Sequence, residues 1–157
     1  LTAHLDPASE LVVAIGTGGR NIKAADAARH IWGYAVGLDM TRRDLQNDMK
    51  KQGRPWCIGK AFEQSAPIGP IVPIGTTGEL TTGAISLTVN GQARQSADLK
   101  DLIWNVNETI EHLSAAWTLQ PGDLIYSGTP AGVAAVVRGD VMEGHIAGLP
   151  SLRVAVR

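Results

Sequence analysis

The 157-residue chain has few aromatic residues and a single cysteine, Cys57, which rules out a disulfide bond within the chain. No apolar run approaches the ~20 residues that a membrane-spanning helix requires. The formal net charge is −1, so the sequence lacks the concentrated basic surface that binds nucleic acid phosphates. We therefore expect a cytoplasmic protein with neither a membrane nor a nucleic acid as its partner.

What the sequence does have is glycine, at 18 residues, and a hydrophobic fraction of 44%. This composition favours strands and turns over a helical bundle. The length suits one domain with one sizeable core. Because the chain begins at Leu1 without Met and enters a strand-like run, we expect residues 1–157 to be a single domain whose N-terminal part is missing.

Hydrophobic periodicity predicts strands separated by a few helices. Alternation of Ile85, Leu87 and Val89 before the Asn90–Gly91 pair predicts a β-hairpin with a type I′ turn. The other expected strands are 10–15, 34–38, 123–128 and 150–156. Their clustering predicts an α+β fold with few helices.

Three helices are expected. Residues 23–31 are rich in alanine. Thr41 and Asp44 fit a capping box that starts a helix ending near Gly53. Apolar residues at helical spacing predict a long amphipathic helix over 98–117. The proline-rich segment 54–78 excludes another long helix.

Several polar residues stand at predicted strand ends or in turns, where functional groups are usually mounted. They are Glu10, Asp39, Arg43, Gln46, Lys60 and Thr129. The four histidines are scattered and give no zinc pattern. Glu10 and Asp39 could supply carboxylate oxygens to a hard cation, Mg²⁺ or Mn²⁺, although acids at such positions are often structural.

Each of these residues also has a purely structural interpretation. Arg43 in a first helical turn could be solvated, but a cation there opposes the helix dipole, which favours a functional role. Gln46 and Lys60 could be ordinary surface residues, and Thr129 a turn residue. Cys57 is expected to be a buried, inert thiol. The four tryptophans are expected in the core or at an interface.

Three longer motifs stand out, GYAVGLDMTRRDLQNDMKKQGRPWCIGKAFEQSAPIGP, GDLIYSGTPAGV and ELVVAIG. Together they resemble the fumarylacetoacetate hydrolase family. The segment RQSADLKDLIWNVNETIEHLS is most similar to family members that act on fumarylpyruvate. The resemblance implies mixed β-sheets rolled into a barrel-like sandwich, a homodimer, and one Mg²⁺ or Mn²⁺ held by three carboxylates.

By position, the resemblance assigns Glu10 and Asp39 to the metal. The family has a third acid two residues before Glu10, where this sequence has Ala8. Alternation along a strand would put positions 8 and 10 on the same face, so the alanine removes one expected ligand unless a neighbour such as Asp6 replaces it. A water-activating His–Glu pair of the family lies upstream of the matching region.

The resemblance also implies roles toward a small-molecule substrate. Lys60 would face the substrate as a catalytic and binding residue, Arg43 and Gln46 would contact its oxo-acid end, and Thr129 would hydrogen-bond its carboxylate. The implied reaction is hydrolysis of a carbon–carbon bond in a β-diketo acid, most specifically of fumarylpyruvate to fumarate and pyruvate in aromatic catabolism through gentisate. A metal at the oxo-acid end would act as the electron sink.

Two other functions remain open at this point. The same metal chemistry would support decarboxylation of oxaloacetate or hydrolysis of another acylpyruvate. A catalytically silent binding protein with this fold is the alternative from a different class, and Ala8 favours it.

Overall fold

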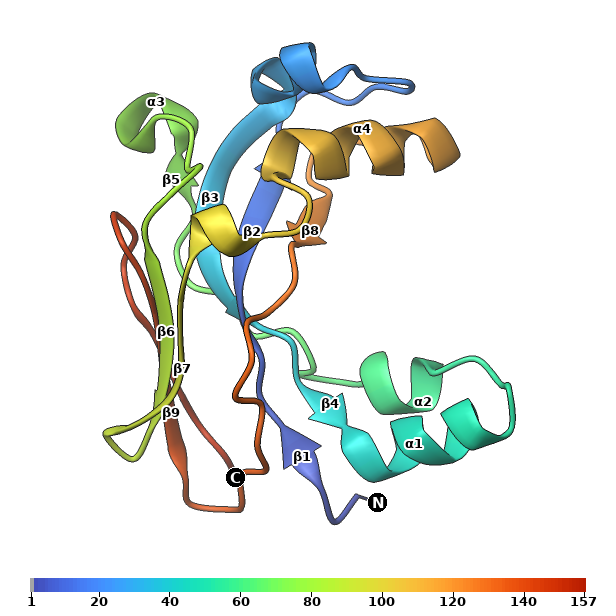
Figure 1. Ribbon diagram of the computed structural model, residues 1–157, viewed down its shortest axis with the longest axis vertical. Helices are drawn as coiled ribbons and strands as arrows, with labels where there is room; N and C mark the ends of the chain where they lie inside the picture. Colours follow the sequence, from blue (N-terminus) through green and yellow to red (C-terminus); the bar gives the residue numbers. More distant parts are fainter. Residues whose placement is uncertain (1) are drawn as a thin grey trace.

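The most apolar run of the sequence forms the centre of a sheet. In the computed structural model, which describes residues 2–157, all seven residues of β2 (Ser9–Ile15) are buried. β2 pairs with β3 (Ile31–Leu38) on one side and β8 (Leu124–Tyr126) on the other. With β5 (Val72–Pro73) this gives the order β5-β3-β2-β8 (Figure 1).

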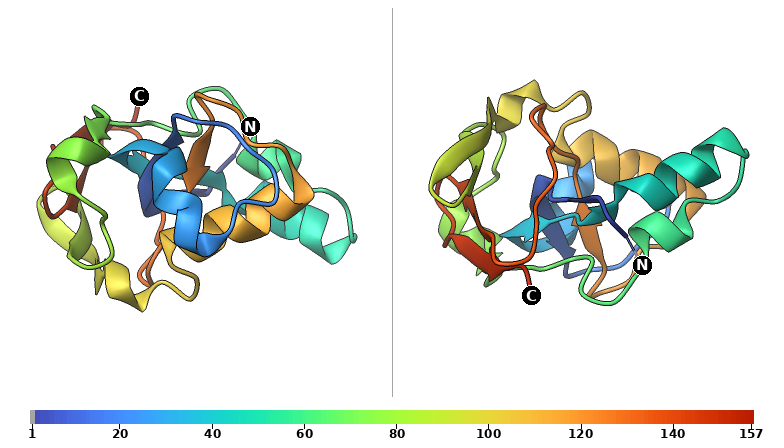
Figure 2. Two further views of the ribbon diagram at one scale, coloured as in Figure 1. Left: turned by 90° about the horizontal axis from the view of Figure 1, so that it is seen from above. Right: turned by 90° about the horizontal axis from the view of Figure 1, so that it is seen from below.

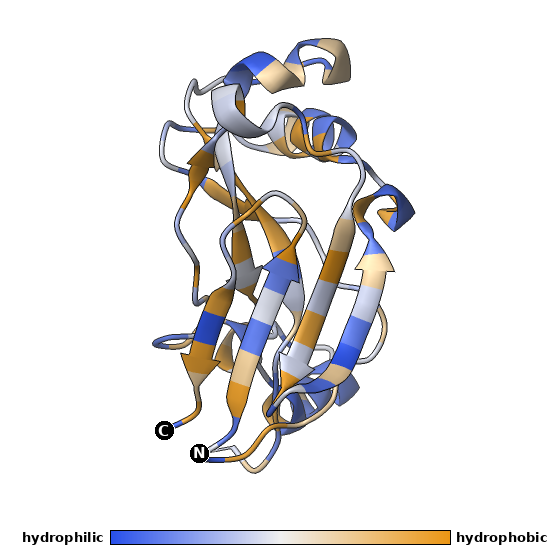
Figure 3. Ribbon diagram, turned by 90° about the vertical axis from the view of Figure 1, so that its left-hand side faces the viewer, coloured by the Kyte–Doolittle hydropathy of each residue, from blue (hydrophilic) through white to orange (hydrophobic). Residues whose placement is uncertain are grey.

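The predicted hairpin forms half of a second sheet. β6 (Ala84–Val89) and β7 (Gln92–Asp98) are joined by Asn90 and Gly91, whose φ angles of 52° and 77° fit the predicted turn. The order β10-β9-β6-β7 is completed by β9 (Val141–Ile146) and β10 (Leu152–Ala155). Apolar and polar residues alternate along these strands (Figure 3).

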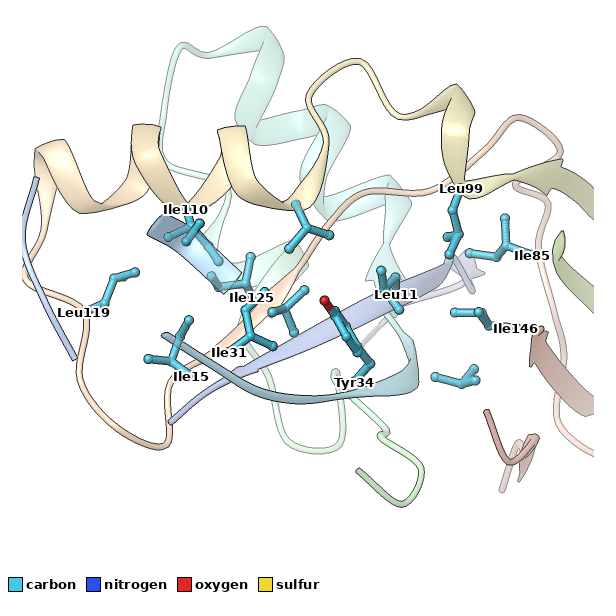
Figure 4. Close-up of a cluster of buried hydrophobic side chains, with 14 of the residues drawn as sticks. Leu11, Ile15, Ile31, Tyr34, Ile85, Leu99, Ile110, Leu119, Ile125 and Ile146 are labelled. Atoms are coloured by element: carbon cyan, nitrogen blue, oxygen red, sulfur yellow. The ribbon is translucent and has the colours of Figure 1, made fainter. Parts of the chain in front are cut away.

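The two sheets pack against each other through their apolar faces (Figure 1). Leu11 of the first sheet meets Ile85 and Ile146 of the second in one buried cluster (Figure 4). Val36 belongs to the same cluster. Gly144 marks the closest approach, because a Cβ atom there would lie 2.9 Å from the Cγ1 atom of Val36. Burial of such side chains stabilises a fold by about 1.5–3 kcal/mol each.

The remaining elements lie at the two ends and on one flank of this sandwich (Figure 2). At one end α4 (Val106–Ala116) packs on η1 (Ala24–His30), and at the other α1 (Arg43–Lys51) packs on α2 (Cys57–Lys60). The shorter elements are β1 (Leu5–Asp6), β4 (Thr41–Arg42), α3 (Ile74–Thr77) and η2 (Leu99–Asp101).

The predicted α+β fold with few helices is confirmed, and the structure refines how the strands are arranged. Every strand pairing within residues 2–157 is antiparallel, and the two four-stranded sheets form layers that do not close into a barrel. In the described part of the chain, no helix is long and apolar enough to cross a membrane.

Two helix predictions are wrong in detail. Thr41 is not an N-cap, since α1 begins at Arg43 and Thr41 lies in β4, where its hydroxyl accepts a hydrogen bond from Lys60. The predicted helix over 98–117 is divided in two, because Asp98 caps η2 and Asn105 caps α4 with separate capping boxes. Strong caps overrode a continuous apolar pattern.

Burial predictions for the rarer side chains also need correction. Cys57 is exposed, because it opens the short surface helix α2. The four tryptophans, Trp32, Trp56, Trp104 and Trp117, are 45–64% exposed, so none belongs to the core. An interface role for them stays a prediction. β9 was not predicted at all.

Candidate active site

The two faces of the sheet that contains β2 have different chemistry. Ser9 and Leu38 lie against Gly144 of the second sheet, so the odd-numbered residues of β2 face the sandwich interior. Because side chains alternate along a strand, Glu10 faces the opposite side. On that side, α1 and α2 stand beside the end of β3 (Figure 1).

Asp39 lies directly across the ladder from Ala8. The backbone N–H of Asp39 donates to the carbonyl of Ala8 at 2.8 Å, and the N–H of Ala8 donates back at 3.2 Å. Glu10 is opposite Gly37 in the same register. Positions 8, 10 and 39 therefore share one face; strand alternation predicted this for positions 8 and 10, and the pairing with β3 adds position 39.

Glu10 is a buried carboxylate, with 5% of its surface exposed. Its Oε2 atom accepts a hydrogen bond of 2.9 Å from the backbone N–H of Gly128. Burial raises the pKa of Glu10 to about 7. The hydrogen bond from Gly128 lowers this pKa, the charge of Asp39 raises it further, and the charge of Lys60 lowers it. Burial thus disfavours the ionised form of Glu10, and a bound cation would favour that form.

Lys60 connects the carboxylate pair to β4. From the last residue of α2, its ammonium group contacts Asp39 Oδ2 and donates to Thr41 Oγ1 at 2.8 Å. An ammonium group has three N–H donors, so one remains for a ligand. Gly59 permits this arrangement, since a Cβ atom there would lie 2.9 Å from the backbone nitrogen of Gln46 in α1.

The donor set suits a hard divalent cation in part. Glu10 and Asp39 present carboxylate oxygens from one face of the sheet, Glu10 from β2 and Asp39 from the end of β3. Within residues 2–157, no three acids, histidines or cysteines cluster as a complete metal site. Asp6 does not join these two acids in such a cluster: its Oδ2 atom accepts a hydrogen bond from Arg43, and its buried Oδ1 atom lies 3.0 Å from His4 Nε2 without a hydrogen bond.

Arg43 and Gln46 form a neighbouring polar group at the start of α1. Arg43 donates through Nε to buried Asp6 at 2.7 Å and through Nη1 to Gln46 Oε1 at 2.6 Å. The guanidinium group has five N–H donors, so three remain. The fixed carboxylate of Asp6 thus orients Arg43, and the predicted contacts of Arg43 and Gln46 with an oxo acid stay a prediction.

The hydroxyl group of Thr129 already makes two hydrogen bonds within the protein. Its hydroxyl donates to the carbonyl of Ser9 at 2.8 Å and accepts a hydrogen bond of 2.9 Å from Gln95. To donate to a ligand carboxylate, the hydroxyl must first release Ser9. The ligand role predicted for Thr129 therefore stays a prediction, with this condition attached.

A cavity of about 610 Å³ adjoins the turn that contacts Glu10. Its wall includes Tyr126, Gly128 and Thr129, and the rest is largely apolar. Those further lining residues include Ile85, Leu99, Leu102, Ile103, Trp104 and Pro130. This volume lies within the range of ~300–1,000 Å³ typical of small-molecule sites.

Two residues of the site were missed in the sequence. The ring of Tyr126 lies over Gly37, and its hydroxyl donates to the carbonyl of Ala66 at 2.9 Å. Burial, followed by the charges of Glu10 and Asp39, raises the pKa of Tyr126. The second residue is Gln95, a fully buried amide on β7; it pairs with Leu87 only because of an irregularity in the ladder, so no pattern in the sequence pointed to it.

Comparison with known proteins identifies the family. Residues 2–157 match the model of the fumarylacetoacetate hydrolase C-terminal region. The chain belongs to the fumarylacetoacetate hydrolase family. Fumarylpyruvate hydrolase of Ralstonia sp is 50% identical over 148 residues, which are 94% of this chain and 76% of that protein. Mitochondrial oxaloacetate tautomerase of Rattus norvegicus is 39% identical over 147 residues, 94% of this chain and 66% of its relative.

Solved structures of this family share the fold closely. The crystal structure of fumarylpyruvate hydrolase from Pseudomonas aeruginosa, in complex with Mn²⁺ and pyruvate, superimposes with a TM-score of 0.97 at 54% identity. It is matched over 99% of this chain, and this chain spans 66% of its length. The family recognised from the motifs is thereby confirmed.

Proposed function

We propose that this chain is a metal-dependent hydrolase that cleaves a carbon–carbon bond of a β-diketo acid, with fumarylpyruvate as the leading substrate and fumarate and pyruvate as products. The observation that carries the proposal is the meeting of Glu10, Asp39 and Lys60 on one face of the sheet. The 50% identity to a fumarylpyruvate hydrolase supports it.

Glu10 and Asp39 are the residues that would hold Mg²⁺ or Mn²⁺. When bound, such an ion supplies a Lewis acid for the oxo-acid end of the substrate. The carboxylates contribute charge and position, and water or substrate oxygens would complete the coordination. The donor chemistry fits this role, and the Mn²⁺ in the Pseudomonas aeruginosa enzyme agrees with it.

Lys60 is assigned to the acyl carbonyl group. Water adds to that carbonyl carbon, negative charge develops on its oxygen, and the free N–H of Lys60 stabilises the charge. The bond between the acyl carbon and C3 of the pyruvate part then breaks. Its electron pair leaves with the pyruvate part, which takes up a proton at C3, while the acyl part leaves as a carboxylic acid.

Arg43 and Gln46 are assigned to recognition of the oxo-acid end. Three N–H donors of Arg43 and the amide N–H donors of Gln46 are left over from their contacts within the protein. A guanidinium group binds a carboxylate well, since its planar donors match two carboxylate oxygens. The cavity beside Gly128, whose wall includes Thr129 but neither Glu10 nor Lys60, is assigned to the acyl arm.

Oxaloacetate is the second candidate substrate. The rat relative, an oxaloacetate tautomerase, is 39% identical to this chain, and oxaloacetate has the same oxo-acid end as an acylpyruvate. Catalytic silence, with retained binding of a 2-oxo acid, is the third candidate because Ala8 removes one expected carboxylate.

One incubation series separates the three. The protein is mixed with Mn²⁺ and either fumarylpyruvate or oxaloacetate, and the products are measured by chromatography and as released CO₂. The proposal predicts fumarate and pyruvate in equal amounts from fumarylpyruvate. CO₂ from oxaloacetate above the amount released with Mn²⁺ alone would favour decarboxylation, and faster keto–enol exchange of oxaloacetate would favour tautomerisation. Mn²⁺ binding with neither products nor faster exchange would establish a silent protein.

We further propose that the chain acts in the cytoplasm as a homodimer with Mg²⁺ as an alternative metal. The support for self-association is that several large apolar side chains are exposed, and an interface between two copies of the chain would cover them. The most exposed are Ile103 at 97%, Val137 at 67% and Trp117 at 64%. Light scattering of the purified protein would show twice the mass of one chain; the mass of a single chain would contradict the dimer.

A further inference from the structure

We propose that Gln95 is a positioning residue that fixes the turn 127–130 and, through it, the carboxylate of Glu10. Gln95 lies in β7, in the sheet opposite the site (Figure 1), and is 2% exposed. A buried amide must satisfy its donors and its acceptor inside the protein. The partners of Gln95 are all at the edge of the candidate site.

The position where β8 separates from β2 explains why a side chain is needed there. The ladder between these strands covers only Val12–Ala14 in β2, and its last backbone contact is the N–H of Ser127 to Leu11. Beyond it, the N–H of Gly128 turns to the side chain of Glu10. The separation of the strands thus brings a backbone donor to Glu10 and leaves Ser9 without a paired strand on that side.

Gln95 fills the gap between β2 and the turn. Its Oε1 atom accepts from the N–H of Ser9 at 2.9 Å, and its Nε2 atom donates to Thr129 Oγ1 at 2.9 Å and to the carbonyl of Pro130 at 2.7 Å. The Thr129 hydroxyl donates in turn to the carbonyl of Ser9. One amide therefore joins the strand that carries Glu10 to the turn that carries the donor to Glu10.

A β-bulge helps to aim Gln95 at this gap. Leu87 pairs with Gln95 but Thr88 pairs with Ala93, so Arg94 is the extra residue in β7. Gly132 packs on the bulge, since a Cβ atom there would lie 2.1 Å from the carbonyl oxygen of Arg94. The bulge and the turn after Pro130 therefore support each other, and Gln95 is held between them.

Loss of the amide should disturb the site as well as the fold. Without Gln95, the N–H of Ser9 is buried unpaired, which costs stability. In addition, the turn loses two anchors, and Gly128 is no longer held against Glu10. Partners that orient a metal ligand typically change metal affinity by about 10–100-fold when removed. This consequence rests on the proposed metal role of Glu10.

The test compares two substitutions of Gln95 with a matched control on the same strand. Gln95→Met keeps the length of the side chain and removes all three hydrogen bonds. Gln95→Glu keeps an acceptor for Ser9 and removes the amide donors to the turn. Gln92→Met changes an exposed glutamine of β7. Mn²⁺ affinity is measured by electron paramagnetic resonance, and exchange of the Ser9 and Gly128 amides by NMR.

Gln95→Met is expected to weaken Mn²⁺ binding roughly 10-fold or more and to speed exchange at both amides. Gln95→Glu is expected to speed amide exchange at Gly128 and to weaken Mn²⁺ binding, with a smaller effect on exchange at Ser9. If Gln95→Met does not fold, Gln95→Glu alone tests the proposal. Gln92→Met should leave both readouts unchanged.

Lower stability with unchanged Mn²⁺ affinity and unchanged Gly128 exchange would overturn the proposal and leave Gln95 as a packing residue. If the unmodified protein binds no Mn²⁺, the proposed function fails, whereas exchange at Gly128 still decides the role of Gln95.

Discussion

The ammonium group of Lys60 contacts both Asp39 and Thr41. These two contacts predict the effect of replacing Lys60. Lys60→Met removes the donor assigned to the developing oxyanion, so turnover should fall about 100-fold or more. Mn²⁺ affinity should be kept or increase, because Asp39 loses a competing cation.

The measurement is steady-state kinetics beside a Mn²⁺ titration, with Lys51→Met at the exposed end of α1 as the control. An equal loss of turnover and metal binding would refute the role assigned to Lys60, since the lysine would then only shape the metal site.

Ala8 is the residue at which this chain departs most from its family. It lies across the ladder from Asp39 and on the face of Glu10, so an acid here would point at the same site. Ala8→Glu should strengthen Mn²⁺ binding by roughly 10-fold or more, because a third anionic oxygen ligand favours a hard dication.

Calorimetric titration measures this effect without relying on activity. Ala8→Gln is the control, because it adds similar bulk at a position that is only 5% exposed but adds no charge. Equal Mn²⁺ affinity in Ala8→Glu and Ala8→Gln would show that position 8 does not face the metal.

At the scale of elements, Val12 of β2 and the ring of Tyr126, which reaches across β2 from β8, limit which residues can replace Gly37. A Cβ atom at Gly37 would lie 2.4 Å from Val12 Cγ2 and 2.7 Å from Tyr126 Cε1. Gly37→Ala should therefore lower the free energy of unfolding by about 1–3 kcal/mol, the usual cost of overpacking. Urea unfolding tests this, with Gly75→Ala in α3 as a control because no atom lies within 4 Å of its added Cβ. Equal stability of both variants would contradict the close packing.

Elements that depend on local patterns were predictable from the sequence. The buried strand β2 and the hairpin β6–β7 follow from apolar runs, alternation and a turn pair, and the structure has both. The division of the expected helix over 98–117 was not predictable, because the apolar spacing continues across the two separate caps, Asp98 and Asn105. β9 carries a weak alternating pattern that only its pairing with β6 and β10 completes.

The site was predictable to the same extent. Strand alternation predicted that positions 8 and 10 share one face, whereas the pairing that adds Asp39 to this face and the contact of Lys60 with Asp39 appear only in the structure. Gln95 could not be found in this way, because its contacts depend on a bulge and on a turn 34 residues further along the chain. The ion pair of Arg43 with Asp6 likewise needs β1 to lie beside β4.

At the scale of the whole molecule, the raised pKa of Glu10 links stability to pH. The folded protein holds the Glu10 proton up to about pH 7, whereas an unfolded chain releases it near pH 4.5. The folded state therefore binds more protons in this interval, and the contribution of Glu10 to stability falls as pH rises from about 4.5 to 7. The fall amounts to about 3 kcal/mol at most and levels off above pH 7.

Urea unfolding without metal at pH 5, 6, 7 and 8 measures this effect when the protein is compared with Glu10→Gln. The amide variant should gain stability relative to the unmodified protein as pH rises. Mn²⁺ at pH 8 should stabilise the unmodified protein alone, since only the ionised carboxylate binds it. A stability difference that does not change with pH would show that Glu10 is not held in its protonated form.

The central claim is that Glu10 and Asp39 together hold a divalent cation, and calorimetric titration with Mn²⁺ tests it most directly. The unmodified protein should bind Mn²⁺ with a Kd below about 1 mM. Asp39→Ala should lose this binding while it keeps its far-ultraviolet circular dichroism, because Asp39 stands just past the end of β3. Absence of Mn²⁺ and Mg²⁺ binding below millimolar concentration, or unchanged affinity in Asp39→Ala, would contradict the claim.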